Sequence, residues 1–287
     1  MALRAGFIGL GNIGAPMAAR LVARGLETTV HDLRPEPVQE LVRQGAKAAG
    51  SPRQLAAASD VVGICVRDDD EVRGALCGDE GVLAGAAPGT VVAVHSTVLP
   101  QTVESLAEEA RARQVDLLDV CLTGGAARAQ QGELTLLAGG DAEPLERARP
   151  YLDAVARTVL PCGPLGSGCK AKLCLNVLTY LQWTAAFEAS SLARAVGLPV
   201  ETLEAAGRAN GQLTDLMVQF LSLHKLPEET RRSEGMQNLL RGHTLVAEKD
   251  LAWALQLARQ AGIGLPGAAL ASQIMARVYG LEDPGRR

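Results

Sequence analysis

The alternation of two kinds of segment constrains the fold of this chain more than any other feature. Through the first half, short apolar runs alternate with segments in which apolar residues recur at helical spacing. The runs suit buried strands, and strands alternating with helices are typical of a doubly wound, largely parallel α/β sheet. The expected strands are Ala5–Leu10, Thr28–His31, Val61–Val66, Val91–Val94, Asp116–Val120 and Leu134–Ala138, with an edge strand at Arg157–Leu160, and the expected helices are Ile13–Arg24, Glu36–Gln44, Glu71–Leu76, Gln101–Arg113 and Pro144–Ala156.

Beyond Pro164 the pattern changes to helix alone. Gly166 and Gly168 precede about 28 residues without Pro or Gly, Cys169 to Val196, which as one helix would extend about 42 Å. Few single domains need so long an element, so we expect it to link domains or subunits. The segments Glu201–Ala209, Thr214–Leu223, Leu245–Ala261 and Ala268–Leu281 also predict helices, and the polar stretch Lys225–Ser233 predicts a surface loop.

The composition excludes several classes of protein. The chain has 287 residues with a formal charge of -4, and only 21% of its residues are charged, so nucleic acid is not an expected partner. The six cysteines form no C-x-x-C pair and there are four histidines, so no metal site is expected. The sequence shows neither a secretory leader nor the run of about 20 apolar residues that spans a bilayer. We therefore expect a cytoplasmic protein that does not act at a membrane.

A glycine motif lies between the first expected strand and the first expected helix. Gly9, Gly11 and Gly14, with Asn12 and Ile13 between the last two, match G-x-G-x-x-G. In that context Gly9 allows a tight turn, Gly11 lets a phosphate approach the backbone, and Gly14 lets helix and strand pack closely. The pyrophosphate of a dinucleotide would then lie at the positive end of the helix.

An acidic residue follows at the spacing that a dinucleotide site requires. Asp32 ends the second expected strand, 18 residues after Gly14, where its carboxylate can accept hydrogen bonds from ribose hydroxyls. That carboxylate would repel a 2′-phosphate and favours NAD, whereas Arg34 can pair with the phosphate and keeps NADP as the alternative. We predict a Rossmann-type NAD(P)-binding domain over residues 1–164 and an all-α domain for substrate and subunit contacts over residues 165–287, linked by the long helix.

Five separated motifs share a pattern with a known family. They are Gly9–Ala18 (G-L-G-N-I-G-A-P-M-A), Ser96-Thr97 with Pro100, Asp119–Thr135, Gly166-x-Gly168 with Lys172 and Asn176, and Lys249-Asp250-Leu251. In this order they resemble the motifs of the β-hydroxyacid dehydrogenases, the family of 3-hydroxyisobutyrate dehydrogenase and tartronate semialdehyde reductase. The resemblance covers nearly the whole chain. It implies an NAD(P)-dependent oxidoreductase that interconverts a small β-hydroxy acid and its semialdehyde.

The pair Lys172 and Asn176 has a spacing that suits catalysis. Residues four apart in a helix share a face, and the glycines at 166 and 168 place the pair in the first turns. A partly desolvated lysine near a positive helix end has its charged form disfavoured, which suits a general acid/base. The resemblance implies that Lys172 exchanges the hydroxyl proton, while Asn176 holds the lysine and the substrate oxygen. The alternative is an ordinary surface lysine, of which Lys170 is an example.

Other site residues depend more on the resemblance. Thr123, Gly124 and Gly125 follow a strand, and the N–H groups of two glycines can bind a carboxylate; the resemblance implies that they hold the substrate carboxylate, and a plain sharp turn is the alternative. The resemblance also implies that Val66, Arg67 and Thr97 lie near the nicotinamide and that Lys249 reaches the cofactor or substrate. Lys249 also fits a solvated charge run.

Several residues depart from the family pattern and leave the substrate open. His95, Cys121, Thr123, Arg128, Leu175 and His243 stand where the family usually has Asp, Pro, Ser, a small residue, Asn and an aromatic. Arg128 either recognises a second anionic group or pairs at a subunit contact, or it is simply solvated.

Two other functions compete with the dehydrogenase. An imine reductase-like enzyme is one, although such proteins usually lack the lysine. A non-catalytic dinucleotide-binding scaffold is the other, and the presence of Lys172 argues against it as well. We expect a homodimer or homotetramer with the helical domain as the contact.

Overall fold

The computed structural model describes residues 3–283, and its contacts divide the chain into two compact units between Lys172 and Leu173. This division lies inside a long helix, α10 (Ser167–Ala195), whose first turn packs with the sheet of unit 1 through the buried Cys169. The sequence places the domain boundary earlier, at residues 164/165. That boundary stays a prediction.

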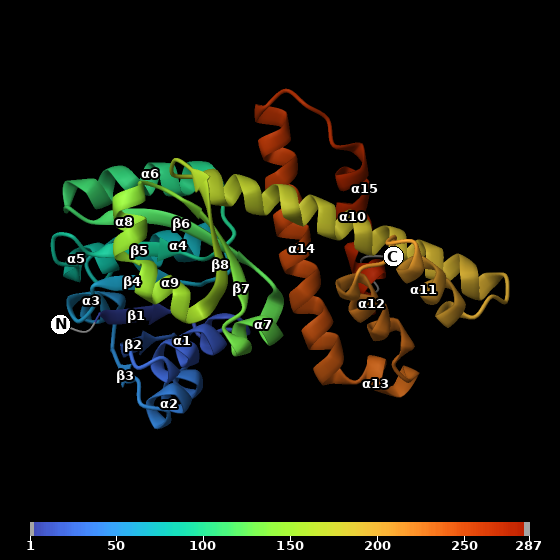
Figure 1. Cartoon of the computed structure of the whole chain (residues 1–287), viewed down its shortest axis with the longest axis horizontal. Coiled ribbons are helices and arrows are strands. Elements are labelled where there is room, and N and C mark those ends of the chain that lie inside the picture. Colours follow the sequence, from blue (N-terminus) through green and yellow to red (C-terminus); the bar gives the residue numbers. More distant parts are fainter. Residues whose placement is uncertain (1–2, 284–287) are drawn as a thin grey trace. The chain divides into compact units, whose positions relative to one another are not determined.

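Unit 1 is built on a single mixed sheet with the strand order β3-β2-β1-β4-β5-β6-β7-β8. Every neighbouring pair is parallel except β6 and β7, which are antiparallel. Figure 1 follows this unit from β1 in blue to the start of α10 in yellow. The strands are β1 (Arg4–Ile8), β2 (Glu27–His31), β3 (Lys47–Ala48), β4 (Val61–Ile64), β5 (Val91–Val94), β6 (Asp116–Thr123), β7 (Leu134–Gly139) and β8 (Ala156–Gly163).

Helices cover both faces of this sheet, because strand side chains alternate between two apolar cores. Phe7 of β1 belongs to the core under α1 and α9, whereas its neighbour Ile8 belongs to the core under α4 and α6. The doubly wound α/β class that the sequence predicts is therefore confirmed. The helices of this unit are α1 (Gly14–Ala23), α2 (Pro35–Arg43), α3 (Pro52–Ala57), α4 (Asp69–Leu76), α5 (Val82–Gly85), α6 (Pro100–Ala112), α7 (Gly125–Gln131), α8 (Ala142–Arg147) and α9 (Arg149–Val155).

Local details of unit 1 differ from the sequence prediction. The single helix expected over Pro144–Ala156 is wrong: α8 ends at Arg147 and α9 begins at Arg149, with Pro150 in its first turn. A proline has no N–H to continue the α8 hydrogen-bond pattern, but it suits the start of a new helix. The short elements β3, α3, α5 and α7 were not predicted.

A buried histidine links two layers of unit 1. The Nδ1 atom of His95 lies 2.8 Å from the Val120 carbonyl oxygen, and Nε2 lies 3.0 Å from the Tyr151 hydroxyl. Because a carbonyl only accepts, Nδ1 carries the proton and Nε2 of the neutral ring accepts from Tyr151. Gly63 leaves room for this link, since a Cβ there would lie 1.9 Å from the Tyr151 hydroxyl. His95 is therefore a core residue, and it does not line the site.

This link makes stability depend on pH. Burial lowers the pKa of His95 from 6.5 to about 4, although the hydrogen bond to Val120 acts in the opposite direction. A lowered folded-state pKa gives stability that is complete above pH 6.5 and is lost as the pH falls toward 4. The expected loss over this window is about 3 kcal/mol. Urea unfolding of the wild type and His95→Asn at several pH values checks this, and parallel pH profiles for the two proteins would contradict it.

Helices are the only regular secondary structure among the described residues of unit 2, 173–283. Besides the rest of α10 it contains α11 (Val200–Ala209), α12 (Asp215–Ser222), the short 3₁₀ helix η1 (Leu223–Lys225), α13 (Glu228–Arg232), α14 (Glu234–Gln260) and α15 (Pro266–Tyr279). Its core is aromatic despite the low aromatic content of the chain. Trp183 of α10 stacks on Phe220 with ring centroids 5.0 Å apart and meets Tyr180 and Tyr279 edge-on.

Two predictions for unit 2 are corrected. The expected loop Lys225–Ser233 contains α13, which Pro227 precedes and a Glu228–Arg232 ion pair of 2.8 Å supports at helical spacing. The helix expected from Leu245 begins earlier, at Glu234, where the Ser233 hydroxyl accepts from the N–H of Met236. Gly235 and Gly242 obscure its early turns in the sequence, because glycine is a poor helix former.

Candidate active site

The turn between β1 and α1 needs glycine at two of its three motif positions for internal reasons. Gly9 has φ +89°, and an added Cβ would lie 2.2 Å from the Cys65 carbonyl oxygen. At Gly14 a Cβ would lie 1.9 Å from the Gly9 carbonyl oxygen, so α1 could not begin where it does. Gly11 differs, because nothing lies within 4 Å of a Cβ there. The open space at Gly11 is where a pyrophosphate can approach the backbone.

The start of α1 can receive that phosphate. Asn12 and Ile13 complete the turn, and the Ile13 N-cap supplies no side-chain hydrogen bond to the first N–H groups of the helix. Helix N-terminal N–H groups and the helix dipole favour an anion. The residues present therefore fit a dinucleotide.

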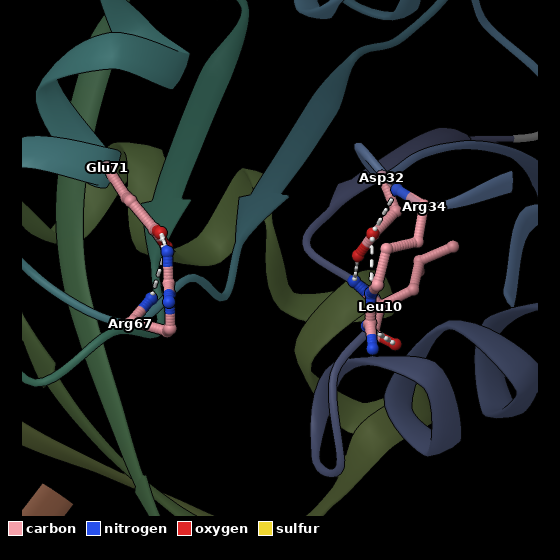
Figure 2. A network of polar contacts seen from close by, with 5 residues as sticks. All are labelled: Leu10, Asp32, Arg34, Arg67 and Glu71. Carbon is pink, nitrogen blue, oxygen red and sulfur yellow. Dashed lines mark hydrogen bonds and ion pairs between the residues drawn. The ribbon is translucent and has the colours of Figure 1, made fainter. Parts of the chain in front are cut away.

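Asp32 lies at the end of β2 beside this turn. Its Oδ2 accepts from the Leu10 N–H at 2.6 Å, and its Oδ1 accepts from the Arg34 N–H at 2.8 Å. Figure 2 shows the Arg34 guanidinium between Asp32 and Leu10, with Nε 3.2 Å from Asp32 Oδ1 and Nη2 3.2 Å from the Leu10 carbonyl oxygen. Burial acts to raise the pKa of Asp32, but these hydrogen bonds outweigh it and the pKa is below its usual value. The side chain is a carboxylate at neutral pH, and Arg34 is engaged by it.

The neighbouring strands β4 and β5 also end beside the turn. Since β1, β4 and β5 are parallel neighbours, Val66, Arg67 and Thr97, which follow β4 and β5, lie at the same sheet edge. The Ser96 hydroxyl joins the two strand ends by accepting from the Val66 N–H at 2.8 Å and donating to the Val66 carbonyl at 2.9 Å. Arg67 pairs with Glu71 (Figure 2) and remains largely exposed. Neither Ser96 nor Glu71 was predicted as a site residue.

The end of β6 leads into an open glycine turn. Thr123 is its last residue, and Gly124 and Gly125 follow with φ +129° and +75°. A Cβ at Gly125 would meet nothing within 4 Å, whereas one at Gly124 would lie 3.0 Å from Cδ of the exposed Arg128. The backbone at Gly125 is thus accessible to a small ligand.

The helix that carries Lys172 begins on β6. Asp119 is fully buried, with Oδ1 2.8 Å from the Gly166 nitrogen and Oδ2 2.7 Å from the Cys169 nitrogen. Lys172 follows Cys169 by about one helical turn. Burial raises the pKa of Asp119, although the hydrogen bonds from Cys169 and Gly166 act to lower it.

In unit 2 a buried carboxylate organises the other site residues. Asp250 of α14 accepts from Asn176 Nδ2 at 2.7 Å and from the Tyr180 hydroxyl at 3.2 Å, both on Oδ2. Lys249 Nζ lies 3.0 Å from Asp250 Oδ1 and 5.8 Å from the ring centroid of Trp253. Asn176 and Lys249 are thus brought together through Asp250. The sequence pointed to the K-D-L motif but not to this role of its aspartate.

Among residues 3–283, no group of His, Cys, Asp and Glu side chains could hold a metal ion, and no helix is long and apolar enough to cross a bilayer. His243 lies 5.9 Å from the Tyr279 ring, and burial lowers its pKa.

Comparisons with known proteins agree with this geometry. Residues 4–163 match the family described as the NAD binding domain of 6-phosphogluconate dehydrogenase. An uncharacterized oxidoreductase of Mycobacterium tuberculosis is 36% identical over 98% of this chain and 95% of its own length. The NAD-dependent L-serine dehydrogenase of Pseudomonas aeruginosa is 41% identical over 71% of this chain and 69% of its own.

A solved structure extends the likeness to the fold of nearly the whole chain. A Mycobacterium tuberculosis 3-hydroxyisobutyrate dehydrogenase, solved with L-serine, has a TM-score of 0.81 at 28% identity, covering 98% of this chain and 94% of its own. The family resemblance of the sequence motifs is therefore confirmed, as are the Rossmann-type NAD-binding domain and the nicotinamide cofactor. The chain belongs to the β-hydroxyacid dehydrogenases and is an NAD(P)-dependent dehydrogenase that acts on the CH–OH group of a hydroxy acid.

Proposed function

We propose that this enzyme interconverts a small β-hydroxy acid and its semialdehyde, with Lys172 as general acid/base. One observation carries the proposal: the helix bearing Lys172 is anchored by its first turn on β6, the strand that ends in the open turn Thr123-Gly124-Gly125. The turn would bind the substrate carboxylate through its N–H groups, and the lysine would meet the hydroxyl.

The proposed steps assign one task to each residue. A nicotinamide bound in this site would supply the hydride chemistry at the carbinol carbon, as acceptor on oxidation and as donor on reduction. Lys172 takes the hydroxyl proton as the carbonyl forms, or donates it in the reverse direction. Asn176, held by Asp250, would orient the lysine and the substrate oxygen. Gly9, Gly11, Asn12, Ile13, Gly14 and Asp32 would hold the dinucleotide, with Arg34, Val66, Arg67, Thr97 and Lys249 around it.

The substrate class follows from chemistry shared among relatives. L-Serine and 3-hydroxyisobutyrate, named for relatives of this chain, both carry a hydroxymethyl group on the carbon next to a carboxylate. The proposed site would bind the hydroxymethyl group and the carboxylate, and the wall of the pocket would contact the third substituent on the same carbon. A homodimer or homotetramer remains our prediction for the assembly.

A substrate panel tests the proposal. The purified enzyme is assayed with L-serine, 3-hydroxyisobutyrate, glycerate, hydroxybutyrate and the corresponding semialdehydes, with NAD and NADP, by nicotinamide absorbance. We expect turnover of acids that carry a hydroxymethyl group beside the carboxylate. Absence of turnover with every acid and semialdehyde would overturn the proposed function.

The contacts of Asp32 give a prediction on cofactor choice. Asp32→Asn removes the charge that repels a 2′-phosphate and releases Arg34 toward it. We expect the ratio of kcat/KM for NADP to that for NAD to rise by about tenfold or more, since juxtaposed like charges cost several kcal/mol. Adding Arg34→Ala should reverse much of the gain. An unchanged ratio in Asp32→Asn would contradict this role of Asp32.

A further inference from the structure

A buried carboxylate anchors the start of α10 to the sheet. Both oxygens of Asp119 accept backbone N–H groups, those of Gly166 and Cys169, which are 47 and 50 residues away in the sequence. An exposed serine or aspartate at the N-cap would satisfy such N–H groups without burying a charge. Burying a carboxylate is costly even when it is hydrogen-bonded. This anchor is therefore more than is needed to cap a helix.

Two glycines around Asp119 let α10 approach the sheet closely. A Cβ at Gly168 would lie 2.4 Å from the Leu137 carbonyl oxygen and 2.6 Å from that of Asp119. Gly139 is paired with Asp119 across β6 and β7, and a Cβ there would lie 2.3 Å from Asp119 Oδ1. The first turn of α10 thus lies directly on the β6–β7 pair in a fixed position.

This position sets the register between β6 and α10. Residues 119, 121 and 123 alternate onto one face of the strand. Asp119 bonds to the nitrogens of Gly166 and Cys169, and the next residue on that face, Cys121, has its sulfur 3.7 Å from that of Cys169. Two strand residues advance about 6.8 Å and the three helical residues from Cys169 to Lys172 about 4.5 Å, so the next residues on the two elements differ by only about 2 Å in their advance. Thr123 and Lys172 are the next residues along each element.

The anchor also places negative charge at the helix end. The N-terminus of an α-helix carries about half a positive charge, which a carboxylate offsets. The sequence suggests that this positive end disfavours the charged form of Lys172. The carboxylate of Asp119 offsets the positive charge of this helix end. It also favours the protonated form of Lys172, which lies about one turn beyond Cys169.

We propose that Asp119 is a positioning residue. It sets Lys172 opposite the substrate turn at Thr123, and its negative charge stabilises the protonated form of the lysine. This proposal rests on the proposed function. Asp119 acts through the backbone of α10 and does not touch the reacting atoms. Its substitution should alter both the placement and the titration of Lys172 while leaving the dinucleotide turn intact.

The test compares D119N and D119S with the wild type and a matched control, D60N. Asp60 also accepts a backbone N–H, that of Arg4 at 2.9 Å, but at the start of β1 and β4, away from α10. Competitive labelling of lysines with acetic anhydride across pH, read by mass spectrometry of the Lys172 peptide, gives the apparent pKa of Lys172 without turnover. Turnover of the best acid from the panel and NAD affinity are measured alongside. D119S is smaller than the native side chain and keeps one acceptor, so it serves if D119N does not fold.

We expect the apparent pKa of Lys172 to fall by about half a unit or more in the Asp119 variants and to stay unchanged in D60N. We expect kcat to fall by roughly tenfold to a hundredfold with NAD affinity near the wild-type value, since small misplacements of reacting groups have effects of this size. Asp119 variants that label and turn over as D60N does would overturn the proposal. If the wild type oxidises no acid, the proposed function fails, and the labelling still decides the role of Asp119.

Discussion

Lys172→Ala is expected to lower kcat by about a thousandfold, because positioned acid/base catalysis commonly contributes a hundredfold to ten-thousandfold. The substitution removes the proposed acceptor of the hydroxyl proton. The dinucleotide site lies at the β1–α1 turn and at the ends of β2, β4 and β5, so NAD affinity should change little. Steady-state kinetics and a calorimetric NAD titration measure the two effects separately.

Lys170→Ala is the matched control for this substitution. Lys170 lies on the same turn of α10, but its Nζ pairs with Glu104 at 3.3 Å, and about half of its side chain is exposed. Exposed ion pairs contribute little to stability, so this variant should turn over near the wild-type rate. Equal losses in the two variants would mean that any lysine at the helix start matters, and an active Lys172→Ala would remove Lys172 from the mechanism.

Gly11→Ala is expected to weaken NAD binding by about tenfold or more, equivalent to at least ~1.4 kcal/mol. Its Cβ would occupy the open space through which the pyrophosphate reaches the backbone. The stability of the fold should not fall, since nothing lies within 4 Å of that Cβ. Alanine also lowers the conformational entropy of the unfolded chain, which favours the folded state. Isothermal titration with NAD and thermal unfolding without it measure both effects.

Two other glycines provide comparisons for Gly11→Ala. Gly74 in α4 also has nothing within 4 Å of an added Cβ, so Gly74→Ala should leave NAD binding unchanged. At Gly14 the Cβ would lie 1.9 Å from a backbone oxygen, so Gly14→Ala should lose stability and binding together. NAD affinity in Gly11→Ala equal to that of the wild type would contradict the placement of the pyrophosphate at this turn.

The parts of the site that were predictable from sequence are those whose cause is local. The glycine motif was predictable because β1, the turn and the start of α1 adjoin in the chain, and Asp32 because it ends the next strand at the spacing that the motif requires. The open turn after Thr123 was predictable for the same reason. Lys172 and Asn176 depended on the family resemblance, because helical spacing alone also allows a surface lysine.

The contacts that fix these residues connect distant parts of the chain and were not predicted. Asn176 and Asp250 are 74 positions apart, and only the packing of α10 with α14 joins them. The antiparallel pairing of β6 and β7 was also missed, since a buried apolar run has the same composition in either direction. His95 was left open because a lone histidine reveals neither its burial nor its bond to Tyr151.

The chemistry of this chain is tested most directly by following the transferred hydrogen. The enzyme is incubated with NAD and either L-serine or 3-hydroxyisobutyrate carrying deuterium on the hydroxymethyl carbon, and the reduced nicotinamide is analysed by mass spectrometry. The proposed function predicts deuterium in the reduced cofactor from at least one acid, and none from Lys172→Ala within the same time. Reduced cofactor without deuterium, or no reduction with any acid that has a hydroxymethyl group beside its carboxylate, would contradict it.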